Sequence, residues 1–157
     1  GMRWPHGIAS HRGMLAISDA GNNRVMVWRQ FPGSNGTPCD FVLGQDSFCG
    51  VDHNRAAYDP TSSAMNMPYG LGLWGDELLV CDTANSRLLS FELDGLAMDA
   101  PAIGLAAQSG FTDKGDNRWG VAGRDSLCWP YGLSSAEQTL AIADTGNNRI
   151  LLWERAP

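Results

Sequence analysis

Short apolar runs recur along this chain in pairs, and a charged hexapeptide separates the two runs of each pair. The runs before the hexapeptide are residues 15–18, 78–81 and 140–143, and those after it are residues 25–28, 88–91 and 150–153. Runs of this length, bounded by turn residues, predict β-hairpins. Because successive residues of a strand point to opposite faces and neither face here is charged, we expect each sheet to be covered on both sides. Sheets stacked face to face around an axis meet that demand, so the pattern favours an all-β propeller.

The hexapeptide itself recurs at residues 19–24, 82–87 and 144–149, so its first residue is repeated after 63 and then 62 positions. Its polar residues are Asp19, Asn22 and Arg24, then Asp82, Asn85 and Arg87, then Asp144, Asn147 and Arg149. The Asp is expected to accept hydrogen bonds from backbone N–H groups across the turn. The Arg is expected to reach a carboxylate or free carbonyls of the neighbouring unit. We interpret these residues as a structural motif rather than a catalytic one, because repeat signatures usually encode turn and stacking chemistry.

Gly and Asn in the hexapeptide are suited to the bend because they accept a positive φ at little cost. Ala84 stands where the other two copies have Gly. We therefore expect either backbone strain or a different turn residue in the middle copy.

The chain is expected to be one domain, residues 1–157, made of units at about 4–66, 67–128 and 129–157. Each unit opens with a Pro-x-Gly segment, and this segment predicts the innermost strand, beside a central channel. Two arms, residues 30–66 and 93–128, align over much of their length, and residues 41–45 predict a fourth, outer strand. The last unit lacks such an arm.

Each unit has a Pro-x-Gly-Leu/Ile segment, then an apolar run, then Asp-Thr/Ala-Gly/Ala-Asn-x-Arg, and then a second apolar run with an aromatic residue. This order of segments resembles the NHL repeat. The resemblance covers essentially the whole chain, and the arms resemble a longer bacterial variety of that repeat. It implies a β-propeller with four-stranded blades, usually six of them. Three units are fewer than the roughly four to eight blades that closed propellers need. We therefore expect a homodimer in which two half-propellers form one six-bladed ring around a two-fold axis; the rival is that the sequence is a piece of a longer propeller.

Charge narrows the range of partners. The formal net charge is −6 and Lys114 is the only lysine, which argues against a nucleic-acid or anionic-membrane partner. RNA binding, known for some NHL propellers, needs clustered basic residues that this sequence lacks. No apolar run approaches the length of a membrane span, and no secretory signal precedes the first unit. If Met2 is the native start, a cytoplasmic location is expected; if upstream sequence was trimmed, an extracytoplasmic one remains open.

His6, Tyr69 and Tyr131 occupy equivalent positions after the Pro of each opening segment. They are the candidate ligand-binding residues at the channel mouth, with simple packing as the alternative. The predicted function is a non-catalytic module that binds a protein or small molecule. The alternative is a metal-dependent lyase or lactonase-like hydrolase with a site on the channel, an activity that the resemblance brings in.

Catalysis is the weaker of these two hypotheses because the chemistry it needs is sparse. The three histidines, His6, His11 and His53, have no paired spacing, whereas catalytic metal sites usually have about three protein ligands. We therefore assign no catalytic residue, no metal ligand and no cofactor. Residues 113–117 match a calcium loop poorly, because the terminal acidic ligand is missing.

Four cysteines, Cys39, Cys49, Cys81 and Cys128, do not recur at the repeat period and show no zinc-site spacing. Cys81 lies in a predicted core strand and is expected to be a small buried apolar residue. Cys39 and Cys49 are expected to be either free thiols or a pair within one arm.

Overall fold

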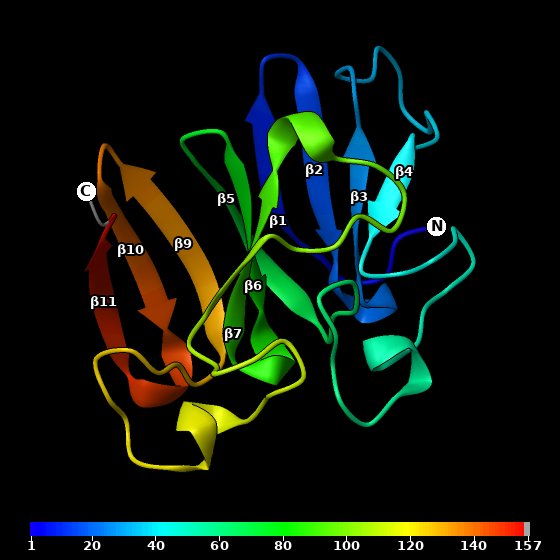
Figure 1. Ribbon diagram of the computed structural model, residues 1–157. Coiled ribbons are helices and arrows are strands. Elements are labelled where there is room, and N and C mark those ends of the chain that lie inside the picture. Colours follow the sequence, from blue (N-terminus) through cyan, green and yellow to red (C-terminus); the bar gives the residue numbers. More distant parts are fainter. Residues whose placement is uncertain (156–157) are drawn as a thin grey trace.

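The structure, a computed structural model that describes residues 1–155, contains three antiparallel β-sheets of four, four and three strands (Figure 1). The first sheet comprises β1 (Pro5–His11), β2 (Met14–Asp19), β3 (Arg24–Trp28) and β4 (Phe41–Leu43). The second comprises β5 (Pro68–Trp74), β6 (Glu77–Asp82), β7 (Arg87–Glu92) and β8 (Gly104–Ala106). The third comprises β9 (Pro130–Ala136), β10 (Thr139–Asp144) and β11 (Arg149–Glu154). The all-β class expected from the sequence is confirmed.

Each hexapeptide connects the second and third strands of its sheet. Its first and last residues face each other in the register, as Asp19 does Arg24 and Asp82 does Arg87. A short 3₁₀ turn lies between them: η1 (Ala20–Asn22), η3 (Thr83–Asn85) and η6 (Thr145–Asn147). The prediction that the hexapeptide forms a hairpin bend therefore agrees with the observed pairing.

Of the two residue types expected to suit the bend, it is Asn and not Gly that adopts the positive φ. Positive φ angles of 52–54° fall on Asn23, Ser86 and Asn148, the fifth residue of each hexapeptide. The third residue, Gly or Ala84, lies inside the 3₁₀ turn and has no positive φ. Ala84 therefore imposes no such strain, and it is Ser86 that adopts the left-handed conformation in the middle copy.

The three sheets pack side by side through their first strands, because β5 contacts both β1 and β9 (Figure 1). One apolar core fills the space between the first and second sheets, with Val27, Phe41, Leu78 and Phe91 among its buried members. A separate core lies between the second and third sheets. Only the second sheet is therefore covered on both faces. The outer faces of the first and third sheets expose Ile8, Ile150 and Leu152.

Two long arms link the sheets. They contain the short outer strands β4 and β8 and the 3₁₀ turns η2 (His53–Ala56), η4 (Leu93–Gly95) and η5 (Asp116–Trp119). Gln45 and Gln108 are buried and hold the arms, since each donates its side-chain amide to backbone carbonyls of the preceding hexapeptide. Within residues 1–155, no helix is long and apolar enough to cross a membrane.

Candidate functional site

The polar residues of the hexapeptide form the same hydrogen-bond network in all three sheets, around an Asp that is fully buried in each. One oxygen of the Asp receives the guanidinium Nε of the Arg, at 2.8 Å for Asp19–Arg24, 2.7 Å for Asp82–Arg87 and 2.6 Å for Asp144–Arg149. The same oxygen accepts the amide of Asn22, Asn85 or Asn147 at 2.8 Å. The other oxygen accepts a backbone N–H from sixteen residues earlier, at Arg3, Asn66 and Cys128. The donor thus lies just before the first strand of the sheet. This differs from the expectation that the donor lies across the turn.

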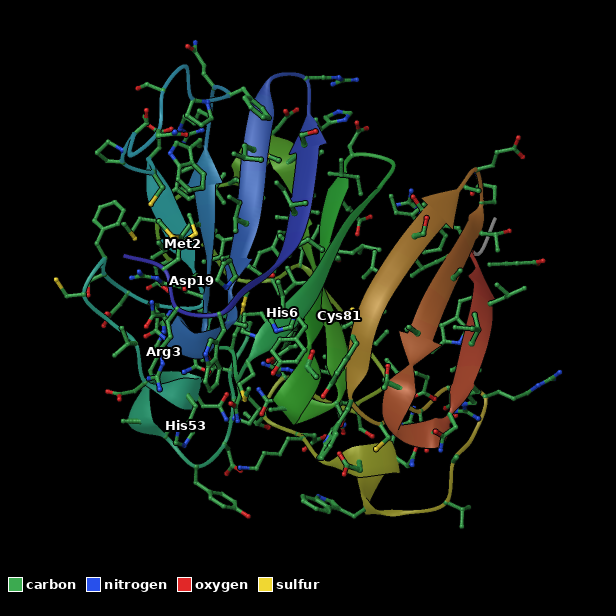
Figure 2. The ribbon with its side chains drawn as sticks, turned by 180° about the vertical axis from the view of Figure 1, so that it is seen from behind. Met2, Arg3, His6, Asp19, His53 and Cys81 are labelled. Carbon is green, nitrogen blue, oxygen red and sulfur yellow. The ribbon has the colours of Figure 1, made fainter. Side chains whose placement is uncertain are left out.

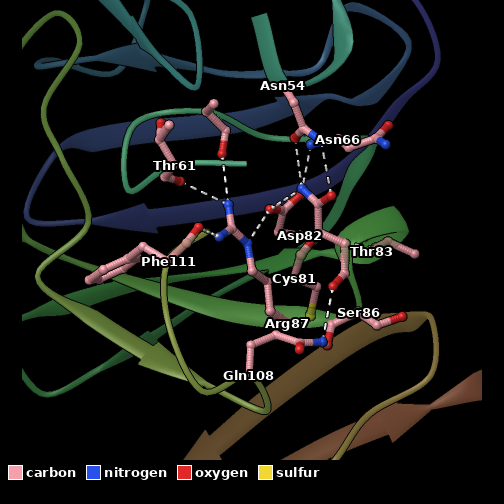
Figure 3. Close-up of polar contacts among 12 residues, drawn as sticks. Asn54, Thr61, Asn66, Cys81, Asp82, Thr83, Ser86, Arg87, Gln108 and Phe111 are labelled. Carbon is pink, nitrogen blue, oxygen red and sulfur yellow. Dashed lines mark hydrogen bonds and ion pairs between the residues drawn. The ribbon is translucent and has the colours of Figure 1, made fainter. Parts of the chain in front are cut away.

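The Arg side chain extends this network into the arms (Figure 3). Arg87, fully buried, donates to the carbonyl of Phe111 in the arm that follows its sheet. It also donates to the carbonyls of Thr61 and Ala64 in the arm that precedes it. Each of the three guanidinium nitrogens therefore donates to an acceptor within the protein, and the side chain serves the structure.

Asparagines join each arm to the next sheet. Asn54 and Asn85 exchange side-chain hydrogen bonds at 3.2 and 2.9 Å, and both are buried. Asn117 and Asn147 exchange the equivalent pair, both at 2.9 Å. The sequence aligned Asn54 with Asn117 but did not reveal this role, because the partners lie about thirty residues away in the chain.

The three candidate ligand-binding residues lie together in a row. The rings of His6 and Tyr69 stack with centroids 4.0 Å apart and an interplanar angle of 16°. Tyr131 meets the edge of Tyr69 at 4.9 Å and 72°. The row runs across β1, β5 and β9, so each sheet contributes one side chain. Figure 2 shows His6 where the first sheet meets the second, in agreement with its stacking on Tyr69 of β5.

Exposure and electrostatics show what this aromatic row can do. His6 and Tyr131 are exposed, Tyr131 by 43%, and Tyr69 is half-buried between them. Burial, and then the neighbouring phenol of Tyr131, raise the pKa of Tyr69 above its ordinary value. Tyr69 is therefore a neutral hydrogen-bond donor at neutral pH. The row offers flat apolar surface together with polar ring atoms, a combination suited to stacking an aromatic or planar group.

The other histidines lie elsewhere. His11 ends β1, at the opposite end of the strand from His6, and its Nε2 is buried without a hydrogen-bond partner. His53 is exposed in η2 of the first arm (Figure 2). Among residues 1–155, no three or more His, Cys, Asp or Glu side chains form a group that could hold a metal ion.

All four cysteines are free thiols in this structure. Cys81 is fully buried, as expected, and burial raises its pKa far above the ordinary value. Burial and then Asp116 raise the pKa of Cys128 to about 11. A thiol in its neutral form is a poor nucleophile, so neither residue suits nucleophilic catalysis at neutral pH.

A groove of about 360 Å³ lies between the two arms and was not anticipated from the sequence. Its wall includes Tyr58, Lys114 and the exposed Trp119. The Lys114 ammonium sits 3.4 Å from the centroid of the Tyr58 ring and 3.7 Å from the carboxylate of Asp59. These contacts satisfy the lysine within the protein and tie one arm to the other.

Comparisons with known proteins do not supply a family. No family model matches this sequence, and no curated protein matches it. One similar solved structure is the computationally designed Ika8 protein, with a TM-score of 0.38 and 8% identity over 96% of this chain. The match covers 46% of that protein, so the chain spans less than half its length.

Proposed function

We propose that this protein is a non-catalytic binding module built from three NHL-type propeller blades, each sheet being one blade. The hexapeptides support the blade assignment. In all three sheets the same Asp–Asn–Arg set ties the second and third strands to the start of the first strand. A residue set that repeats its contacts sheet by sheet is what a repeat architecture requires.

The observation that carries the binding function is the row of His6, Tyr69 and Tyr131. Three chemically similar side chains stand at equivalent positions of three strands and are in ring-to-ring contact. They lie where the first strands converge, and in a propeller this is the surface of the central channel. Binding sites in such folds combine apolar surface with a few polar groups, which the row provides.

Catalysis has less support. The Asp–Arg pairs, which are the most conspicuous charged groups, are used for structure, and the three histidines lie apart. A lyase or hydrolase site would need a metal or an activated nucleophile near the channel. The binding role needs only the aromatic surface that is present.

A ligand-observed NMR screen of small aromatic and heterocyclic compounds tests this proposal. We expect compounds whose saturation-transfer signal is strong with the wild-type protein and is lost in both Tyr69→Ala and Tyr131→Ala. The matched control is Tyr58→Ala, which removes another exposed tyrosine far from the row, in the first arm. Compounds that bind all four proteins equally, or no binding to any, would contradict the proposed site.

A further inference from the structure

The free face of the third sheet carries the same groups that join the sheets elsewhere in the chain, but here they lack partners. Both internal junctions use a glycine that lets two first strands approach closely and a side chain that caps a backbone N–H. The junction between the second and third sheets adds a threonine hydroxyl that donates to a carbonyl. All three are present again at the outer side of the third sheet. This recurrence shows what kind of surface should cover it.

The glycine device is clearest. A Cβ on Gly7 would lie 2.4 Å from the carbonyl oxygen of Tyr69, and one on Gly70 would lie 2.9 Å from that of Tyr131. Gly132 is the equivalent residue of the third sheet, and nothing lies within 4 Å of its Cβ position. Close approach excludes any side chain at the first two positions. At Gly132 the same space is open.

The capping device follows the same order. Asn23 accepts the backbone N–H of Met67 at 2.8 Å, and Ser86 accepts that of Trp129 at 3.2 Å. Asn148 is the equivalent residue of the third hexapeptide; it is exposed, and its side chain makes no hydrogen bond within residues 1–155. At the other end of the molecule, the N–H of Trp4, equivalent to those of Met67 and Trp129, also has no partner in the described chain.

The hydroxyl device completes the set. Thr83 donates to the carbonyl of Pro130 in the next sheet at 2.6 Å. Its equivalent, Thr145, is exposed and reaches only the carbonyl of Ala143, at 3.4 Å. Pro5, the counterpart of Pro130, opens the first sheet of this same chain. The donors and acceptors missing from one end are thus present at the other.

The apolar surfaces complement each other in the same way. On the third sheet, Ile150 and Leu152 are 65% and 68% exposed. Ile150 corresponds to Leu88, which lies in the core between the second and third sheets, and Leu152 corresponds to Ser90. On the first sheet, Ile8 is 66% exposed and corresponds to Leu71, which is buried against the first sheet. Each free face is the counterpart of a face that is buried elsewhere in the chain.

We infer that the third sheet of one copy packs against the first sheet of a second copy, and that two copies close into a ring. The outer face of the third sheet carries the groups that bind the next sheet at the internal junctions. The outer face of the first sheet carries the groups that bind the sheet before it at those junctions. Two identical junctions related by a two-fold axis satisfy both faces of both chains, and closure prevents endless growth. Each junction would bring Gly132 and Asn148 of one copy to β1 of the other and to Trp4, the residue before that strand.

This inference deepens the proposed function, on which it rests, because closure would complete the aromatic row. Tyr131 of one copy would then adjoin His6 of the other, as Tyr69 adjoins Tyr131 within the chain. The partner copy therefore contributes half of the ligand surface. A continuous ring of six such side chains is available only in the closed dimer.

Gly132→Val tests the junction without disturbing the single chain, because its added methyls enter open space and its backbone has no positive φ. We expect the wild-type protein to sediment as a dimer and this variant to dissociate at least roughly tenfold more readily, since overpacking acts at both junctions. Gly33→Val is the matched control, since Gly33 is equally open but lies in an exposed arm, and it should remain dimeric. Circular dichroism of both variants should match that of the wild type.

Ile150→Glu is the second variant, and it should also favour the monomer because a charge would have to be buried at each junction. A wild-type protein that is monomeric throughout a dilution series would overturn the inference. So would open polymers, or dimers that neither variant weakens. The mass readout needs no ligand, so its failure is distinct from a failure of the compound screen, which would count against the binding site alone.

Discussion

Arg87 links three segments: its own hexapeptide, the arm before it and the arm after it. Its Nε pairs with Asp82, and its terminal nitrogens bind carbonyls of Thr61, Ala64 and Phe111. Both members of the ion pair are fully buried. A planar fork with five donors can satisfy all these acceptors at once, which a lysine ammonium cannot do from one point. The Arg of the repeated motif is therefore explained by the number and placement of buried carbonyls.

Replacing Arg87 by Lys should lower the free energy of unfolding by about 2–4 kcal/mol, because buried carbonyls lose their donors while the charge stays buried. Urea denaturation followed by tryptophan fluorescence measures this change. Arg118→Lys is the control, because Arg118 pairs with Asp125 at the surface. Its effect should stay within about 1 kcal/mol. Equal losses in the two variants would show that the buried network adds nothing specific.

At the scale of elements, the arms are held to the sheets by amide side chains rather than by long strands. β4 and β8 have only three residues each. The buried Asn54–Asn85 pair and the side chain of Gln45 supply the further contacts. η2 also holds Asn54 and Arg55 at positive φ, a conformation that the surrounding contacts must maintain.

Asn54→Ala should therefore loosen the first arm, because it leaves the buried amide of Asn85 without its reciprocal partner. We expect a loss of about 1–3 kcal/mol in the stability of this segment. In native-state hydrogen exchange, the variant should exchange faster than the wild type in residues 52–66, whereas the rates in β5–β7 should stay close to those of the wild type. Asn35→Ala, in an exposed loop, is the control and should leave both rates unchanged. Unchanged protection of the arm in Asn54→Ala would disprove the role of this pair.

Much of each sheet could be predicted from the sequence because hairpins are local. The apolar runs around residues 19–24 and 82–87 pair where the pattern indicates. The long-range partners could not be predicted, since the N–H that Asp82 accepts belongs to Asn66, sixteen residues away. For the middle copy, the sequence left open either strain at Ala84 or a different turn residue, and the positive φ at Ser86 agrees with the second alternative. For the candidate site, equivalent spacing placed His6, Tyr69 and Tyr131 correctly at one position of each sheet, but it did not reveal that their rings touch.

For the whole molecule, the uneven burial of the three sheets is the central feature. The second sheet is covered on both faces, whereas β11 alternates between half-buried and exposed residues. Two of the exposed positions, Ile150 and Leu152, are apolar and the third is Glu154. Neighbouring apolar side chains on a protein surface commonly mark an interface. Thr145 and Asn148 add polar side chains to that face and Gly132 adds open space, so hydrogen bonding and shape would both select the partner that we propose.

The molar mass of the 157-residue protein in solution, measured by multi-angle light scattering over a range of concentrations, tests this account most directly. Closure by a second copy predicts a mass of about twice 16.9 kDa that does not grow as the concentration rises. A folded protein with a constant mass near 16.9 kDa would contradict it, because the free faces of the first and third sheets would then be stable in water.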